Sequence, residues 1–201
     1  MRSRDGSIEP SRDRKGAESE HPSLTVGARN PRNAVPLAYH IVLTCYGARL
    51  HGDEAGSVDR DHNLPGTEHL PSNPQQAQSE LDRMAQTPYQ MDGPRRKIVL
   101  EAVREVCIYR HWDLLAVHVR TTHIHAVVRA VVVPERILGD FKSYSSRRLN
   151  ESGFDQAGCK RWSHHGSTGY LWKRQQVLAA IQYVLEAQGE PMEVYPVQAA
   201  T

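Results

Sequence analysis

The chain has 201 residues and a formal net charge of +2, so it is long enough for one domain with an ordinary core and has no charge excess that identifies a partner. Its three cysteines stand far apart without a CxxC pair, which argues against a disulfide framework or a cysteine-rich zinc site. No run approaches the roughly 20 apolar residues that span a bilayer, and the polar N-terminus lacks the apolar centre of a secretory signal. We therefore expect a cytoplasmic protein without a membrane partner.

The composition divides the chain into a tail, a domain with an insertion, and a second tail. Residues 1–36 mix polar residues, glycine and proline without periodicity, which predicts a disordered tail. Residues 37–190 are interpreted as the domain. Within it, residues 53–93 are polar and rich in proline, and we expect an insertion with one short helix at about 75–84. Residues 191–201 follow as a C-terminal tail.

The spacing of apolar residues predicts alternating strands and helices in the domain. In chain order we expect a strand at 37–46, a helix at 94–111, strands at 113–120 and 123–133, a helix at 134–150, a strand near Tyr170 and a helix at 173–188. The short turn between the second and third strands predicts an antiparallel hairpin. This order indicates an α+β, ferredoxin-like fold, in which an antiparallel sheet has helices packed on one face.

The third of these strands contains two histidines with one apolar residue between them. Because side chains alternate along a strand, His123 and His125 are expected on one face, and Ile124 and Ala126 on the other. Two imidazoles on one face can bind a divalent metal together. The alternative is an ordinary polar strand face, since the same three-residue pattern occurs by chance in many proteins.

These features together resemble a known family. A hydrophobic residue between two histidines, on a strand preceded by a strand and followed by a helix, is similar to the motif of the HUH endonucleases. The fuller order resembles the single-tyrosine transposases, which are the insertion sequence 200-like and REP-associated tyrosine transposases. The resemblance covers about residues 38–190 outside the insertion: the strand Tyr39–Leu43, the histidine motif, and a last helix with a tyrosine and, near its end, Gln188.

The resemblance implies a fold of the HUH endonuclease type and a set of partners. The DNA would be single-stranded and hairpin-forming, and His123 and His125 would hold Mg²⁺ or Mn²⁺. In relatives the tyrosine helix of one subunit completes the site of the other, which implies a homodimer.

Two helical tyrosines compete for the role of nucleophile. Tyr144 shares a stripe with Ile137 and Phe141, so we expect it in the core. Tyr183 is expected nearly opposite the apolar stripe of its own helix, which consists of Val177, Ile181, Val184 and Leu185. The position of the tyrosine in relatives also favours the last helix. We therefore assign Tyr183 as the catalytic residue.

The third metal ligand is where this chain departs from the family. Relatives place Gln or Asn four residues after the tyrosine, and here that position is Ala187, which has no ligand atom. Glu186 lies nearer the face of Tyr183 than Gln188, which projects about 140° away on an ideal helix. We expect Glu186 as the third ligand and Gln188 as the less favoured choice, with water as a further alternative.

Eight cations are candidates for phosphate contacts, each with a solvated surface cation as the alternative. They are Arg95, Arg96, Lys97, Lys142, Arg147, Arg148, Lys173 and Arg174.

The sequence thus predicts a metal-dependent tyrosine DNA transposase that cleaves and rejoins single-stranded DNA through a 5′-phosphotyrosine. The first alternative is a domesticated relative that binds DNA without cleaving it, which Ala187 favours. The second is a metal hydrolase that uses the histidine pair on small phosphoesters. In the third, the histidines bind no metal.

Overall fold

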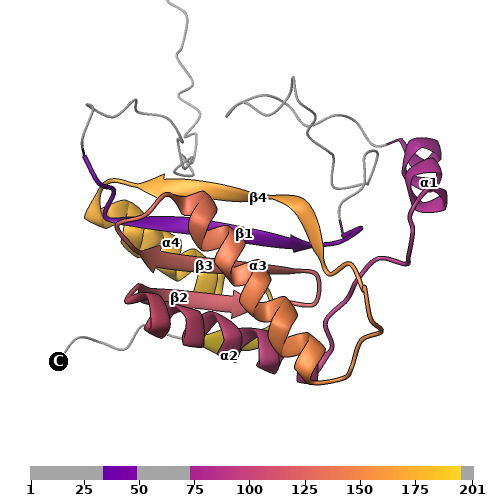
Figure 1. Cartoon of the computed structure of the whole chain (residues 1–201). Helices are drawn as coiled ribbons and strands as arrows, with labels where there is room; N and C mark the ends of the chain where they lie inside the picture. The colour runs from indigo at the N-terminus through magenta and orange to yellow at the C-terminus, as the bar shows by residue number, and fades with distance from the viewer. Residues whose placement is uncertain (1–33, 49–72, 196–201) are drawn as a thin grey trace, which may run out of the picture.

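The computed structural model describes residues 34–48 and 73–195 (Figure 1). The described elements are β1 (Ala38–Cys45), α1 (Pro74–Asp82), α2 (Gly93–Arg110), β2 (Asp113–Val119), β3 (His123–Arg129), α3 (Pro134–Glu151), β4 (Trp162–Leu171), α4 (Arg174–Glu186) and β5 (Glu193–Tyr195). Every helix and strand expected from the sequence is present near its expected bounds. The expected N-terminal tail up to residue 33, and residues 53–72 of the expected insertion, lie outside the described residues.

The five strands form one antiparallel sheet in the order β4-β1-β3-β2-β5. The first four strands in this order, with α2 and α3 as the connections, give the topology of a ferredoxin-like fold, so the predicted α+β class is confirmed. In the central pair, β1 and β3, His40 lies opposite Val127 and Val42 lies opposite His125. The histidine motif is therefore carried by an inner strand that is fixed on both sides.

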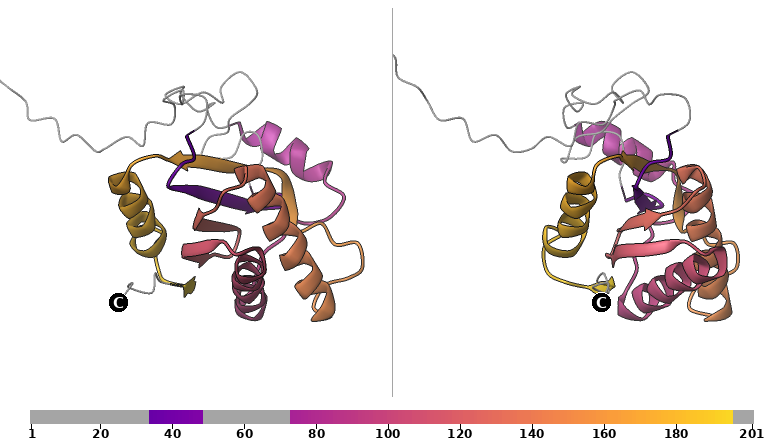
Figure 2. Two further views of the ribbon diagram at one scale, coloured as in Figure 1. Left: turned by 60° about the vertical axis from the view of Figure 1, so that its left-hand side comes forward. Right: turned by 90° about the vertical axis from the view of Figure 1, so that its left-hand side faces the viewer.

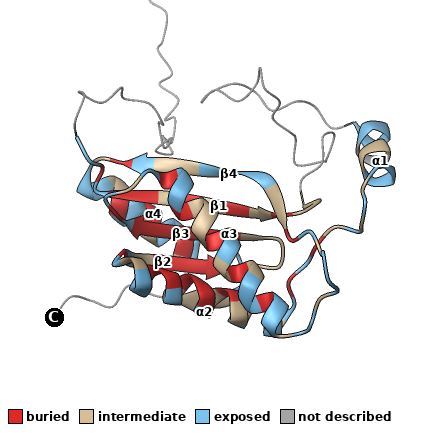
Figure 3. Cartoon of the chain, in the orientation of Figure 1, coloured by how far each residue is buried: buried red, intermediate tan, exposed pale blue. Residues whose placement is uncertain are grey.

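The two long helices begin at signals that are visible in the sequence. Asp92 caps α2 by accepting a hydrogen bond from the backbone N–H of Arg95 at 3.0 Å, and Pro94 lies in the first turn. Pro134 likewise opens α3. Both helices pack on one face of the sheet, where Ile41, Leu43, Ile124, Val103 and Phe141 belong to the main core (Figure 3).

The last helix covers the opposite face of the sheet, which corrects the expectation that the helices share one face. Figure 2 shows α4 on one side of the sheet, with α2 and α3 on the other. A second, smaller core forms here from Ala38, Ala116, Val127 and Leu171 of the sheet and Val177, Ala180 and Val184 of α4. The alternation of β3 explains this arrangement, because Val127 points away from Ala126 and Val128 and needs its own cover. The helix α4 thus packs on the face of the sheet to which His123, His125 and Val127 of β3 point.

The end of the expected insertion and part of the expected C-terminal tail both pack against the sheet and its helices. The end of the expected insertion packs into the main core through Tyr89 and the fully buried Met91. The expected C-terminal tail contains β5, which pairs with the edge strand β2. A strand of three residues is too short to show periodicity, so the sequence pattern missed it. None of the helices in the described part of the chain is long and apolar enough to cross a membrane.

Candidate active site

The two histidines of β3 lie on the face covered by α4. Their ring centroids are 5.0 Å apart, with the rings nearly perpendicular. Ile124 and Ala126, between and after them, are buried in the main core on the other face, as the alternation predicts. His125 is the more enclosed of the two, with 9% of its surface exposed.

A third histidine, which sequence reasoning did not assign to the site, joins this pair from β1. His40 Nε2 lies 3.1 Å from His125 Nδ1, and the two rings stack with centroids 5.3 Å apart. The signal was present in the sequence, because Tyr39 and Ile41 face the main core and the residue between them must face the other way. What the sequence did not show is that β1 and β3 pair in the register that brings these positions together.

Burial fixes the charge state of His40. It lowers the pKa of this histidine from 6.5 to about 4, so the ring is neutral at neutral pH. A neutral imidazole has one N–H donor and one acceptor nitrogen, and the contact with His125 uses one ring nitrogen of each residue. His40 therefore restricts which tautomer and which ring orientation His125 adopts.

The phenol of Tyr183 lies against these histidines. Its ring centroid is 5.6 Å from that of His125 and 5.9 Å from that of His40, with both contacts edge to face. The side chain is 39% exposed, so its ring is accessible to a substrate. Tyr183 belongs to the same chain as the histidines it contacts.

The position of Tyr183 on α4 differs from the expected one. The buried stripe consists of Val177, Ala180 and Val184, while Ile181 and Leu185 are only partly buried beside it. Tyr183 lies about 60° around the helix from Ala180, on the flank of this stripe rather than nearly opposite it. One edge of the Tyr183 side chain therefore contacts the histidines of the sheet, while the rest stays exposed to solvent.

The competing tyrosine lies in the other layer. Tyr144 packs against the main core, with its ring 6.3 Å from that of Tyr109 on α2 and the guanidinium of Arg147 above it. Because α3 and α4 cover opposite faces of the sheet, Tyr144 and the histidine pair are separated by the sheet itself.

The candidates for a third metal ligand do not join the histidines in this conformation. Glu186 accepts a hydrogen bond from Gln182 at 2.9 Å, and Gln188 donates to the backbone oxygen of Tyr183 at 3.4 Å. Within residues 34–48 and 73–195, no three side chains of His, Cys, Asp or Glu gather closely enough to hold a metal ion. Metal binding by His123 and His125 therefore stays a prediction.

The candidate phosphate contacts are divided between the two faces of the sheet. On α2 and α3, Arg95 pairs with Asp92 and Asp155, and Arg148 pairs with Glu105 and Glu151. Lys142 donates to the backbone oxygens of three consecutive residues, 163 to 165. Arg96 donates to the backbone oxygen of Met91, and Lys97 is exposed. Lys173 and Arg174 are exposed at the start of α4 and so lie on the same side of the sheet as the histidines.

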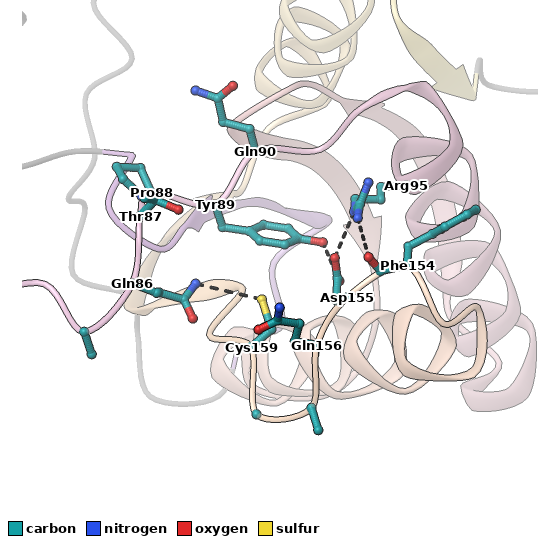
Figure 4. A pocket seen from close by; sticks show the side chains of 13 residues that line it. Gln86, Thr87, Pro88, Tyr89, Gln90, Arg95, Phe154, Asp155, Gln156 and Cys159 are labelled. Atoms are coloured by element: carbon teal, nitrogen blue, oxygen red, sulfur yellow. Dashed lines mark hydrogen bonds and ion pairs between the residues drawn. The ribbon is translucent and has the colours of Figure 1, made fainter.

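A pocket of about 650 Å³ lies elsewhere, where residues 85–90 approach residues 154–159 (Figure 4). Asp155 is its centre, because it accepts hydrogen bonds from Tyr89, Arg95 and Arg161 at 2.7 to 2.9 Å. Burial raises the pKa of Asp155, but the hydrogen bonds outweigh this effect and the net shift is downward. The residues that line this pocket do not include His40, His123, His125 or Tyr183. Asp155 connects the two segments through its hydrogen bonds.

Comparison with known proteins gives one family. Residues 88–184 match the model of the family described as "Transposase IS200 like". The matched span begins before α2 and includes the histidine motif and Tyr183. A solved structure from Deinococcus radiodurans R1, described as a candidate transposase, is 16% identical, with a TM-score of 0.39 over 81% of this chain and 98% of that chain. A search of curated proteins finds no match.

Proposed function

This chain belongs to the IS200-like transposase family, and on that premise we propose that it cleaves and rejoins single-stranded DNA through a covalent bond between Tyr183 and a 5′-phosphate. One observation supports this proposal above the others. Tyr183, His125 and His40 come from three separate elements, and their ring centroids lie within 6 Å of one another, with Tyr183 partly exposed. A tyrosine beside imidazoles suits phosphodiester transfer, because the phenol supplies the nucleophile and a metal held by imidazoles would polarise the phosphate.

The proposed reaction conserves the energy of the phosphodiester bond. The phenolic oxygen of Tyr183 attacks the phosphorus and loses its proton to solvent, while the bond from phosphorus to the 3′ oxygen breaks. The leaving 3′ oxygen takes up a proton, so one ester replaces another without hydrolysis. A 3′-hydroxyl, from the same strand or from another, then attacks the phosphotyrosine and frees Tyr183.

His123 and His125 would hold the divalent metal, Mg²⁺ or Mn²⁺. When bound, the metal polarises the phosphate and neutralises charge that develops on its oxygens. Two imidazoles fit the start of such a site, and the remaining positions are left to water and phosphate oxygens, because Glu186 and Gln188 make other hydrogen bonds. His40 holds the ring of His125 in place, as outer partners of metal-bound histidines commonly do.

Lys173 and Arg174 are the cations best placed to contact the DNA backbone near this site. Lys173 is the N-cap of α4 and Arg174 begins its first turn, where the helix dipole also attracts phosphate. The paired cations of α2 and α3 lie behind the sheet and would contact only more distant DNA. Within one chain, Tyr183 already lies beside His125, and the homodimer that the resemblance implies stays a prediction.

The experiment is an adduct assay with a labelled oligonucleotide library built around a hairpin of randomised sequence, in the presence of Mn²⁺. A 5′-phosphotyrosine retains the 3′ part of the strand, so a 3′ label is expected to migrate with the protein and a 5′ label is not. Tyr183→Phe should abolish the adduct, and Tyr144→Phe, a matched change behind the sheet, should leave it intact. No adduct with the wild-type chain, or one that survives Tyr183→Phe, would refute the proposal.

A DNA-binding relative without cleavage is the second candidate, and the incomplete metal site among the described residues favours it. It predicts that the library binds with the same affinity to wild type and to Tyr183→Phe, while neither forms an adduct. A hydrolase of small phosphoesters predicts instead that Tyr183→Phe retains activity on a chromogenic phosphodiester.

A further inference from the structure

A fourth histidine lies on the same face of the sheet, under the C-terminal end of α4. His118 of β2 is fully buried and lies directly opposite His125 in the pairing of β2 with β3. Its Nδ1 is 3.1 Å from the backbone oxygen of Val184, and its Nε2 is 3.1 Å from the backbone nitrogen of Met192. Both ring nitrogens are therefore engaged with the backbone.

The two partners determine the tautomer of His118. The backbone N–H of Met192 donates, so Nε2 accepts. The backbone oxygen of Val184 accepts, so Nδ1 carries the hydrogen and donates. One neutral ring thus ties the last turn of α4 and the segment leading into β5 to the edge strand β2. Arg120 adds a second tie, because its guanidinium donates to the backbone oxygen of Glu190 at 2.8 Å.

Val184 immediately follows Tyr183, and its carbonyl lies in the last turn of the helix, where carbonyls lack a partner within the helix. Apart from the ring contacts of Tyr183, α4 packs on the sheet through apolar side chains such as Ala180 and Val184, and such contacts are non-directional. A hydrogen bond to one carbonyl instead fixes the rotation and height of the helix. It therefore fixes where the ring of Tyr183 lies relative to His125 and His40.

We propose that His118 is a positioning residue, which seats the end of α4 so that Tyr183 faces the histidine pair; this inference rests on the proposed strand-cleavage function. His118 touches neither the phosphate nor the metal in this scheme. Its effect on the reaction is through the placement of the neighbouring residue in the chain.

Two conservative variants separate the two hydrogen bonds. In His118→Asn the side-chain amide nitrogen takes the position of Nδ1 and keeps the donor to Val184. In His118→Gln the side-chain oxygen takes the position of Nε2 and keeps the acceptor for Met192. Val117→Ala is the matched control, because Val117 is a fully buried neighbour that faces the main core rather than α4.

The expected result is a loss of adduct-forming rate of about tenfold to 100-fold in His118→Gln and of less than about threefold in His118→Asn, as misplacement of a reacting group implies. Affinity for the oligonucleotide library, measured by fluorescence anisotropy, should be unchanged in both. Hydrogen exchange should be faster in the amides of α4 in His118→Gln than in His118→Asn, and unchanged in β1 and β3.

Three outcomes would overturn the inference. The first is a wild-type rate of adduct formation in His118→Gln, and the second is a loss of rate in His118→Asn equal to that in His118→Gln. The third is the same loss of rate in Val117→Ala when that variant and His118→Gln lose equal thermal stability. Absence of an adduct in the wild type would refute the proposed function, but it would not refute the positioning of α4 by His118. In that case the exchange of the α4 amides decides whether His118 holds the helix, since equal protection in the two variants contradicts it.

Discussion

Replacing His40 by phenylalanine is expected to change how the stability of the protein depends on pH. Burial lowers the pKa of His40 from 6.5 to about 4, so the folded state holds the neutral ring while the unfolded chain takes up a proton below pH 6.5. The stabilisation from this difference is complete above pH 6.5 and is lost as the pH falls toward 4. Phenylalanine keeps a ring at this position and cannot titrate.

The size of the effect follows from the two pKa values. Their difference corresponds to at most about 3 kcal/mol at pH 4, because one pKa unit is worth about 1.4 kcal/mol. Between pH 7 and pH 5.5 the expected loss is about 1 kcal/mol. Groups that His40 does not contact, Asp155 among them, titrate equally in wild type and variant and cancel in the comparison.

The assay is urea unfolding of both proteins at several pH values from 7 to 4, in the presence of a chelator so that no metal competes for the histidines. The free energy of unfolding of the wild type should fall more steeply with decreasing pH than that of His40→Phe. Parallel curves would show that His40 has the same pKa in the folded and the unfolded state, and would refute the conclusion that burial keeps this ring neutral.

Three further results are expected. Ala187→Gln restores an amide four residues after Tyr183 and should tighten Mn²⁺ binding several-fold by calorimetry, and unchanged affinity would show that this position does not reach the metal. Mixing Tyr183→Phe with His125→Ala should not restore adduct formation, because each chain contacts its own tyrosine; recovery of activity would mean that the helix crosses between subunits. Asp155→Asn should lower the free energy of unfolding by about 3 kcal/mol, since it leaves the buried guanidinium of Arg161 without its charge partner, and a thermal shift below that of a surface Asp→Asn control would contradict this.

The order of elements and the shared face of His123 and His125 were predictable, because both depend on local periodicity. Residues that meet through pairing of distant strands were not. His40 is 85 positions from His125, and only the register of β1 against β3 brings them together. The position of Tyr183 was predicted in outline, but the apolar stripe was drawn without Ala180, and this placed the tyrosine too far from the sheet.

The cations show a different limit of sequence reasoning. The sequence of a basic run such as Arg95 to Lys97 is the same whether its charges are exposed to solvent or neutralised by acidic side chains elsewhere in the chain. Asp155, which pairs with Arg95, lies 60 residues later in the chain. The pattern therefore identified charges without showing which of them are available to a phosphate.

The helix that bears Tyr183 is held at both of its ends, by β4 through Leu171 and by β5 through its pairing with β2. In the proposed reaction a cut DNA strand would be carried by this helix. Its 5′ end would then stay where it was cut, and resealing would be a unimolecular event at high effective concentration. The outcome of each cycle would be a kinetic competition between two 3′-hydroxyls for one stationary phosphate, and the strand that occupies the site longer would determine whether DNA is repaired or moved.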